Sequence, residues 1–257
     1  MLELGGETLI LTHDMMAEGT HYLPGADMAD VAWKLVAVNL SDLAAKGAQP
    51  LGVLIGYSLG EGDGRFLSGL RDVLNEFDVP LLGGDTVRIK GPRSMGLTAI
   101  GKATYIPVPD RRGAKPGDVI YATGVMGRAM LGFEGLMEHT ATYNRPTPLL
   151  DEGQALAPHV SAMMDISDGL LLDSWRLAKA SDVSIALDSA AIPVADPARH
   201  NDCLRWGDDY QLLFTAAPGT PIPVAATQIG MVEVAGPSPL CLDGAWLGDT
   251  SGLGYQH

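Results

Sequence analysis

Four aspartates stand in short motifs where a carboxylate could hold a cation. Asp14 closes Thr12-His13-Asp14, Asp85 follows Gly83-Gly84, and Asp165 and Asp168 belong to Asp165-Ile166-Ser167-Asp168-Gly169. Each motif comes after a short apolar run that reads as a strand, and α/β sheets gather ligand sites at strand ends. If these carboxylates converge, they predict a site for divalent metal ions such as Mg²⁺.

Asp42 is a fifth candidate, because it lies on the apolar face of a predicted helix. Steps of four, three and four residues lead from Val31 through Leu35 and Val38 to Asp42. An ionised carboxylate on such a face is costly unless it is paired or binds a metal. Hydrogen bonds to the backbone amides of a loop are an equally good explanation for Asp42 alone. Helix capping is the structural alternative for Ser167 and Asp168.

The elements that must position these residues alternate along the chain. Strands are expected at 7–12, 51–59, 81–85 and 95–105, with helices at 27–46 and 64–78. Prolines and glycines between residues 107 and 117 mark a boundary, after which strands at 118–123 and 183–187 and a hairpin at 240–247 follow. This order predicts α/β or mixed α+β packing in two domains, residues 1–109 and 110–257.

Composition narrows the class of protein. The 257 residues are 46% hydrophobic and carry a net charge of −14, which argues against nucleic acid as a partner. Cys203 and Cys241 have no zinc-site spacing and are expected to be free thiols. No apolar run reaches membrane-spanning length and no signal peptide is visible, so we expect a cytoplasmic protein with no membrane partner.

Five motifs, taken together and in order, resemble the thiamine-monophosphate kinase family, in the superfamily of aminoimidazole ribonucleotide synthetase. They are Val38-Asn39-Leu40-Ser41-Asp42-Leu43-Ala44-Ala45, Gly83-Gly84-Asp85-Thr86, Gly113-Ala114-Lys115-Pro116-Gly117-Asp118, Asp165-Ile166-Ser167-Asp168-Gly169-Leu170 and Gly207-Asp208-Asp209-Tyr210. The resemblance implies ATP-dependent phosphorylation of thiamine monophosphate to thiamine diphosphate by direct in-line transfer. It also implies an N-terminal mixed-sheet domain that forms a homodimer, and a C-terminal α/β domain.

The resemblance also assigns roles to individual residues, without a catalytic side chain of the protein. The implied Mg²⁺ ligands are Thr12, His13 through its backbone, Asp14, Asp42, Asp85, Asp165 and Asp168. The implied ATP contacts are Gly84, Asp85, Arg111 and Ser167, and the implied thiamine phosphate contacts are His21, Gln211 and Tyr255. Taken alone, His21 is more often a structural histidine. For Arg111 a solvated charge beside Arg112 and a phosphate contact are equally good explanations.

The sequence departs from the family pattern at three places. The family has a Gly-Asp-Asp motif before its first strand and more residues between the positions of Trp206 and Gly207, and we hypothesise that the printed sequence omits such segments. Gln211 replaces a family glutamate, which removes a negative charge. Alternatives are a relative that synthesises selenophosphate or aminoimidazole ribonucleotide, and a nucleotide-binding protein without turnover.

Overall fold

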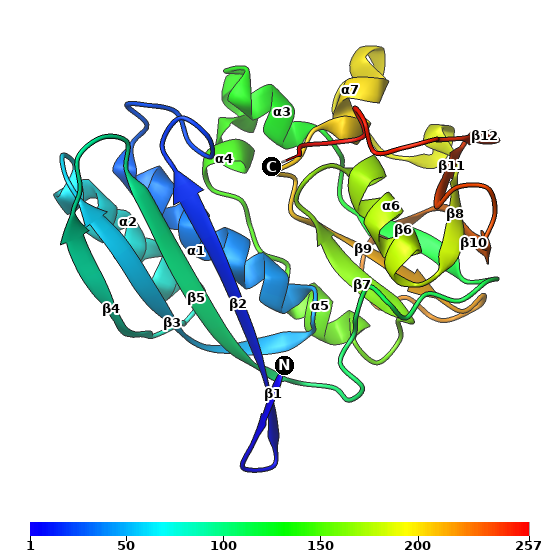
Figure 1. Cartoon of the computed structure of the whole chain (residues 1–257), viewed down its shortest axis with the longest axis horizontal. Coiled ribbons are helices and arrows are strands. Elements are labelled where there is room, and N and C mark those ends of the chain that lie inside the picture. Colours follow the sequence, from blue (N-terminus) through cyan, green and yellow to red (C-terminus); the bar gives the residue numbers. More distant parts are fainter. Residues whose placement is uncertain (257) are drawn as a thin grey trace.

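The N-terminal half of the structure is a five-stranded mixed sheet covered on one face by two helices. The computed structural model describes residues 1–256. The strands are β1 (Leu2–Leu4), β2 (Glu7–Ala17), β3 (Ala48–Leu59), β4 (Leu81–Arg88) and β5 (Ser94–Ala103), in the order β1-β2-β5-β3-β4. Helices α1 (Met28–Ala44) and α2 (Asp63–Glu76) lie behind this sheet in Figure 1. Only β3 and β4 pair in parallel.

The C-terminal half contains a seven-stranded mixed sheet. Its strands are β6 (Val119–Thr123), β7 (Ala162–Ile166), β8 (Val183–Leu187), β9 (Gln211–Ala216), β10 (Ala226–Val234), β11 (Leu240–Leu242) and β12 (Ala245–Trp246). They follow the order β12-β11-β8-β10-β6-β9-β7, in which only β8 and β11 pair in parallel. The helices are α3 (Arg128–Phe133), α4 (Thr140–Asn144), α5 (Leu150–Leu156), α6 (Leu170–Ala180) and α7 (His200–Arg205), with short 3-10 helices at 137–139, 189–191 and 197–199.

Helix α1 forms where the apolar spacing predicts it. Asp27 caps its first turn by accepting a hydrogen bond of 2.9 Å from the Ala29 N–H, and Gly47, at φ +57°, follows its end. Val31 and Leu35 are buried in the N-terminal core. At its C-terminal end the helix also meets the other half, because Ala44 and Ala45 share an apolar cluster with Leu156, Met163, Leu212 and Phe214.

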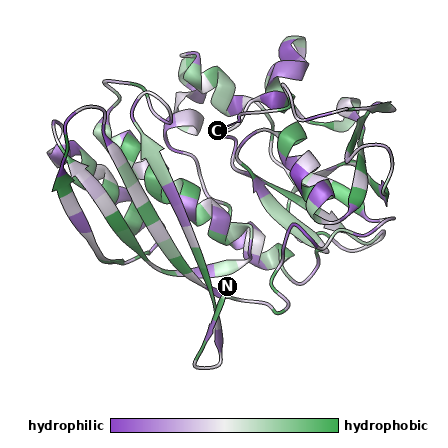
Figure 2. Ribbon diagram, in the orientation of Figure 1, coloured by the Kyte–Doolittle hydropathy of each residue, from purple (hydrophilic) through white to green (hydrophobic). Residues whose placement is uncertain are grey.

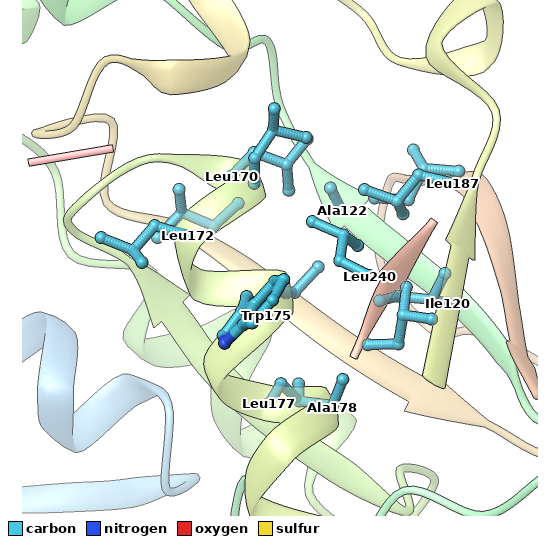
Figure 3. Packing of buried hydrophobic residues seen from close by; sticks show 14 of the residues in the cluster. Ile120, Ala122, Leu170, Leu172, Trp175, Leu177, Ala178, Leu187 and Leu240 are labelled. Atoms are coloured by element: carbon cyan, nitrogen blue, oxygen red, sulfur yellow. The ribbon is translucent and has the colours of Figure 1, made fainter. Parts of the chain in front are cut away.

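Helix α6 supplies much of the C-terminal core. Its Leu170, Trp175 and Leu177 pack with sheet residues such as Ile120 and Leu240 (Figure 3). In Figure 2 hydrophobic residues, drawn in green, recur along both sheets and along α1. Within residues 1–256, no helix combines the length and the apolar character needed to cross a membrane.

The mixed α+β architecture is confirmed, but the expected relation between the aspartates and the strand ends is partly wrong. Strand β2 continues to Ala17 and β4 to Arg88, so Asp14 and Asp85 lie inside strands, because both strands stay paired beyond these residues. Asp165 is the last residue but one of β7, as expected. The domain boundary between residues 109 and 110 remains a prediction.

We predict that Gly69→Val destabilises the N-terminal half. Helices α1 and α2 approach so closely that a Cβ at Gly69 would lie 2.2 Å from the Ala29 carbonyl oxygen. Such overpacking costs about 1–3 kcal/mol or more, which urea unfolding would measure. The matched control is Gly64→Ala on the same helix, where a Cβ meets nothing within 4 Å. The control should leave stability unchanged or raise it by about 0.5–1 kcal/mol; equal destabilisation by both variants would contradict the close-approach argument.

Candidate active site

A cavity of about 590 Å³ lies between the two halves of the chain. The N-terminal half contributes residues of β2, the following loop and α1, and the C-terminal half contributes the loops at 165–168 and 205–210. Two chemical groups dominate the walls. The carboxylates are Asp14, Asp42, Asp165, Asp168 and Asp208, and the aromatic rings are Phe133, Tyr143, Trp206, Tyr210 and Tyr255.

Helix α1 presents three residues to this cavity at helical spacing. Lys34, Val38 and Asp42 are separated by four residues each, so they lie on one stripe of the helix. Eight residues of α-helix span about 12 Å, which separates the lysine from the carboxylate by two turns. The helix therefore offers a cation at one end of the cavity wall and an anion at the other.

Asp42 and Asp165 line the same cavity from different halves, close enough for the charge of Asp42 to act on Asp165. The Thr12 hydroxyl donates a hydrogen bond to Asp42, and the Ser41 hydroxyl donates to Asp165 Oδ2 at 2.7 Å. Burial raises the pKa of the Asp42 carboxyl, and burial together with the nearby charge of Asp42 raises that of Asp165 well above its usual range. Two desolvated carboxylates in this relation repel each other when ionised, and a cation between them would remove that repulsion.

The loop that carries Ser167 and Asp168 is held by a residue of α6. Asp173 accepts hydrogen bonds from the backbone N–H groups of Ser167 at 3.1 Å and Asp168 at 2.9 Å. Arg176 pairs with Asp168 and, at 2.9 Å, with Asp173. Burial raises the pKa of Asp173 to about 6. The capping explanation for Ser167 and Asp168 is wrong, because the helix begins at Leu170 after Gly169 and no side chain caps it.

Several residues singled out from the sequence meet at this cavity. Asp14, His21, Asp42, Asp165, Ser167, Asp168 and Tyr255 line it. Thr12 reaches it through Asp42, as described above. His21 Nδ1 accepts the Ala17 N–H at 3.0 Å, which leaves the ring proton on Nε2 in the neutral histidine.

Other predicted site residues lie elsewhere in the single chain. His13 is on the opposite face of β2, where its Nδ1 is 2.8 Å from the Thr98 hydroxyl. Gly84 and Asp85 belong to β4, three strands away from β2 in the sheet. Gln211 accepts from the Thr123 hydroxyl at 2.9 Å and donates to the Asp209 carbonyl at 3.2 Å. Arg111 does not line the cavity, but its positive charge lowers the pKa of Asp42 against the larger effect of burial.

Lys34 is a cavity residue that was not singled out from the sequence. Lys34 is buried and pairs with Asp208 at 2.7 Å, with its ammonium 3.9 Å from the centre of the Tyr143 ring. Lys34 lies four residues before Val38 and eight before Asp42, so helical spacing could have placed it on the same face of the helix as Asp42. Asp209, next to Asp208, is buried away from the cavity walls and accepts from the Gly127 and Ala129 N–H groups. Burial raises its pKa to about 7.

The donor set can be tested for its fit to Mg²⁺. Within residues 1–256, no three His, Cys, Asp or Glu side chains are grouped closely enough to form a protein-only metal cluster. Mg²⁺ is usually held by one or two carboxylates, several waters and substrate phosphates instead of a complete protein cage. The pair of Asp42 and Asp165, each of which accepts a hydrogen bond from a hydroxyl group, fits that kind of site.

Comparison with known proteins identifies the family. Residues 1–103 match the N-terminal domain of AIR synthase related protein, and residues 115–235 match its C-terminal domain. The thiamine-monophosphate kinase of Salmonella typhimurium strain LT2 is 42% identical over 236 residues, which are 81% of this chain and 71% of that protein. The thiamine-monophosphate kinase of Escherichia coli K12 is 39% identical over 233 residues, with the same shares.

Solved structures agree with the sequence comparison. The thiamine-monophosphate kinase from Stenotrophomonas maltophilia K279a has a TM-score of 0.86 and 30% identity, covering 95% of this chain and 87% of that one. AaThiL complexed with AMPPCP and TMP has a TM-score of 0.89 and 28% identity, covering 96% of this chain and 87% of that one. The match therefore includes both halves and the cavity between them. On these grounds the chain belongs to the thiamine-monophosphate kinase family of AIR synthase related proteins.

Proposed function

We propose that the cavity transfers the γ-phosphoryl group of ATP to thiamine monophosphate, giving thiamine diphosphate and ADP. The observation that carries this proposal is the pair of neighbouring carboxylates, half-buried Asp42 and buried Asp165, in a cavity of a thiamine-monophosphate kinase fold. The AaThiL structure supports the two substrates, since it is complexed with AMPPCP, an ATP analogue, and TMP. Because the reaction consumes ATP, the cytoplasm is its expected location.

Direct transfer suits the side chains of this cavity. The bond between the γ-phosphorus and the β,γ-bridging oxygen of ATP breaks, a bond from an acceptor phosphate oxygen forms, and ADP leaves. A phosphate monoester is largely dianionic at neutral pH, since its second pKa is about 6, so no general base is needed to generate the nucleophile. This explains why a kinase can work with positioning and charge neutralisation and without a catalytic side chain.

The carboxylates must hold cations for this chemistry, because they would otherwise repel both phosphates. Mg²⁺, when bound, supplies neutralisation of the phosphate charges. Asp14, Asp42, Asp165 and Asp168 are the cavity residues that would hold it. Thr12 and Ser41 orient two of these carboxylates through their hydroxyl groups. The roles of His13 in metal binding, of Gly84, Arg111 and Ser167 toward ATP, and of His21, Gln211 and Tyr255 toward thiamine phosphate remain predictions.

We also propose a homodimer formed through the open face of the N-terminal sheet. Helices α1 and α2 lie behind this sheet, and its front is uncovered in Figure 1. Large apolar side chains are exposed on its strands, namely Leu11 and Met15 of β2, Leu51 and Leu54 of β3, and Leu81, Leu82 and Val87 of β4. An apolar surface of this extent is typical of an interaction site.

The dimer would also account for the position of Asp85. The strand register joins Met15 through Gly96 and Gly56 to Asp85, which is about 14 Å of sheet at the usual strand spacing. Strands β4 and β2 lie on opposite sides of the β5-β3 pair. A two-fold dimer that brings β4 of one copy beside β2 of its partner places Asp85 near the partner's carboxylates. We infer that Asp85 serves the cavity of the other copy.

We predict that purified protein forms thiamine diphosphate from thiamine monophosphate and Mg·ATP, and that excess EDTA stops the reaction. Asp42→Asn should lower kcat by about 100-fold or more, equal to about 3 kcal/mol, because it removes a charge that holds Mg²⁺. Asp72→Asn, at an exposed position of α2, is the matched control and should keep full activity. Product chromatography would measure the rates. ATP binding without any product would instead favour a nucleotide-binding protein without turnover.

A mixing experiment tests whether Asp85 acts across the dimer. Asp42→Asn and Asp85→Asn chains should each be inactive, whereas dimers reassembled from an equal mixture should recover about one quarter of the wild-type activity. The recovery arises because half of the dimers are mixed, and one cavity in each mixed dimer is intact. No recovery, with mixed dimers verified by mass spectrometry, would place Asp85 in the cavity of its own chain. Full activity of the Asp85→Asn protein by itself would place Asp85 outside the reaction.

A further inference from the structure

One ion pair joins the two halves of the chain at the cavity. Lys34 of α1 donates to Asp208 Oδ2 at 2.7 Å, and the lysine side chain is only 6% exposed. The Tyr210 hydroxyl donates to the other oxygen of Asp208 at 3.1 Å, and the Lys34 ammonium lies 3.9 Å from the Tyr143 ring centre. A buried ammonium needs such partners, since an unpaired charge in the interior is strongly destabilising.

A second contact fastens the same helix to the same part of the C-terminal half. The Ser41 hydroxyl donates to Asp165 at 2.7 Å, seven residues after Lys34 along α1. Seven residues of helix span about 10 Å. Asp42 directly follows the second contact, so its carboxylate is carried by a helix that is held at both positions.

The loop that contains Asp208 is bonded to the loop that carries the other carboxylates. The Asp208 N–H donates to the Ser167 carbonyl at 2.8 Å, and the Tyr210 N–H donates to the Ile166 carbonyl at 2.9 Å. Gly207 packs so closely on this loop that a Cβ would lie 2.3 Å from the Ser167 carbonyl oxygen. An interaction that fixes the position of Asp208 therefore also restrains the backbone of residues 165–168.

We propose that Lys34 and Asp208 are a positioning pair, which fixes the separation between Asp42 on α1 and the carboxylates of residues 165–168. The inference rests on the proposed kinase function and adds two residues to it. The pair acts through its contacts with each other, and neither side chain needs to touch a phosphate. In-line transfer depends steeply on placement, so loosening the pair lowers the rate of the chemical step more than substrate binding.

The test compares single variants with the exchanged pair. Lys34→Met and Asp208→Asn should each lower kcat by about 10- to 100-fold, with KM for thiamine monophosphate changed by less than about threefold. Combining Lys34→Asp with Asp208→Lys restores a pair of opposite charges. The kcat of this double variant should be about tenfold higher than that of the single variants. A Lys34 that binds substrate directly gives the opposite result, namely a large rise in KM and no recovery in the exchanged pair.

Arg145→Met is the matched control. Arg145 also pairs with α1, through Asp30 at 2.6 Å, but it does not line the cavity. The control variant should keep kcat within about threefold of wild type. An equal loss of kcat in the control would overturn the proposal, because it would assign the effect to general loosening between the two halves.

Hydrogen–deuterium exchange tests the pair without any turnover. In the ligand-free protein, Lys34→Met should speed exchange of the amides at 165–168 and 207–210, and leave those of β6 unchanged. Unchanged exchange in the two loops would overturn the proposal, and so would a general increase throughout the chain. If wild-type protein makes no thiamine diphosphate, the kinase function fails, while the exchange result still decides whether the pair holds the loops.

Discussion

The repulsion between two desolvated carboxylates, Asp42 and Asp165, is the constraint on which the rest of this structure depends. Asp42 and Asp165 come from different halves, and burial raises the pKa of both. A fold that places them together without a cation would be destabilised, so each carboxylate has a hydroxyl donor from the N-terminal half. The arrangement is costly for the protein alone, and a shared divalent cation would offset that cost. The fold thus holds the two carboxylates in place before the cation and the charged substrates bind.

Helix α1 is the element that makes this arrangement possible. One side of the helix belongs to the N-terminal core, through residues such as Val31 and Leu35. Lys34, Val38 and Asp42 line the cavity, and the end of the helix joins an apolar cluster with the C-terminal half. A single helix thus links the packing of both halves to the position of one cavity carboxylate, Asp42.

The sequence predicted the parts of this site that depend on local pattern. The apolar spacing from Val31 to Val38 predicted α1 and the unusual place of Asp42, because helical periodicity is a local property. Strand β10 was not expected, since Ala226–Val234 mixes polar and apolar residues and contains a bulge near Gly230. The distance of Asp85 from β2 follows from the strand order, which depends on pairings far apart in sequence. Lys34 was overlooked because lysines on helices are usually solvated.

The close contact between α5 and α1 has a consequence for ligand entry. A Cβ at Gly153 would lie 2.0 Å from the Ala44 carbonyl oxygen, so the two backbones touch at the C-terminal end of α1. Packed backbones transmit force and resist shear, which leaves the halves little freedom to hinge about that point. Access would then depend on short segments outside the helices and strands that line the cavity, namely Thr20 and His21 after β2 and Gly254 and Tyr255 near residue 256. Ordering on substrate binding is then expected in these short segments and not at the contact between α5 and α1.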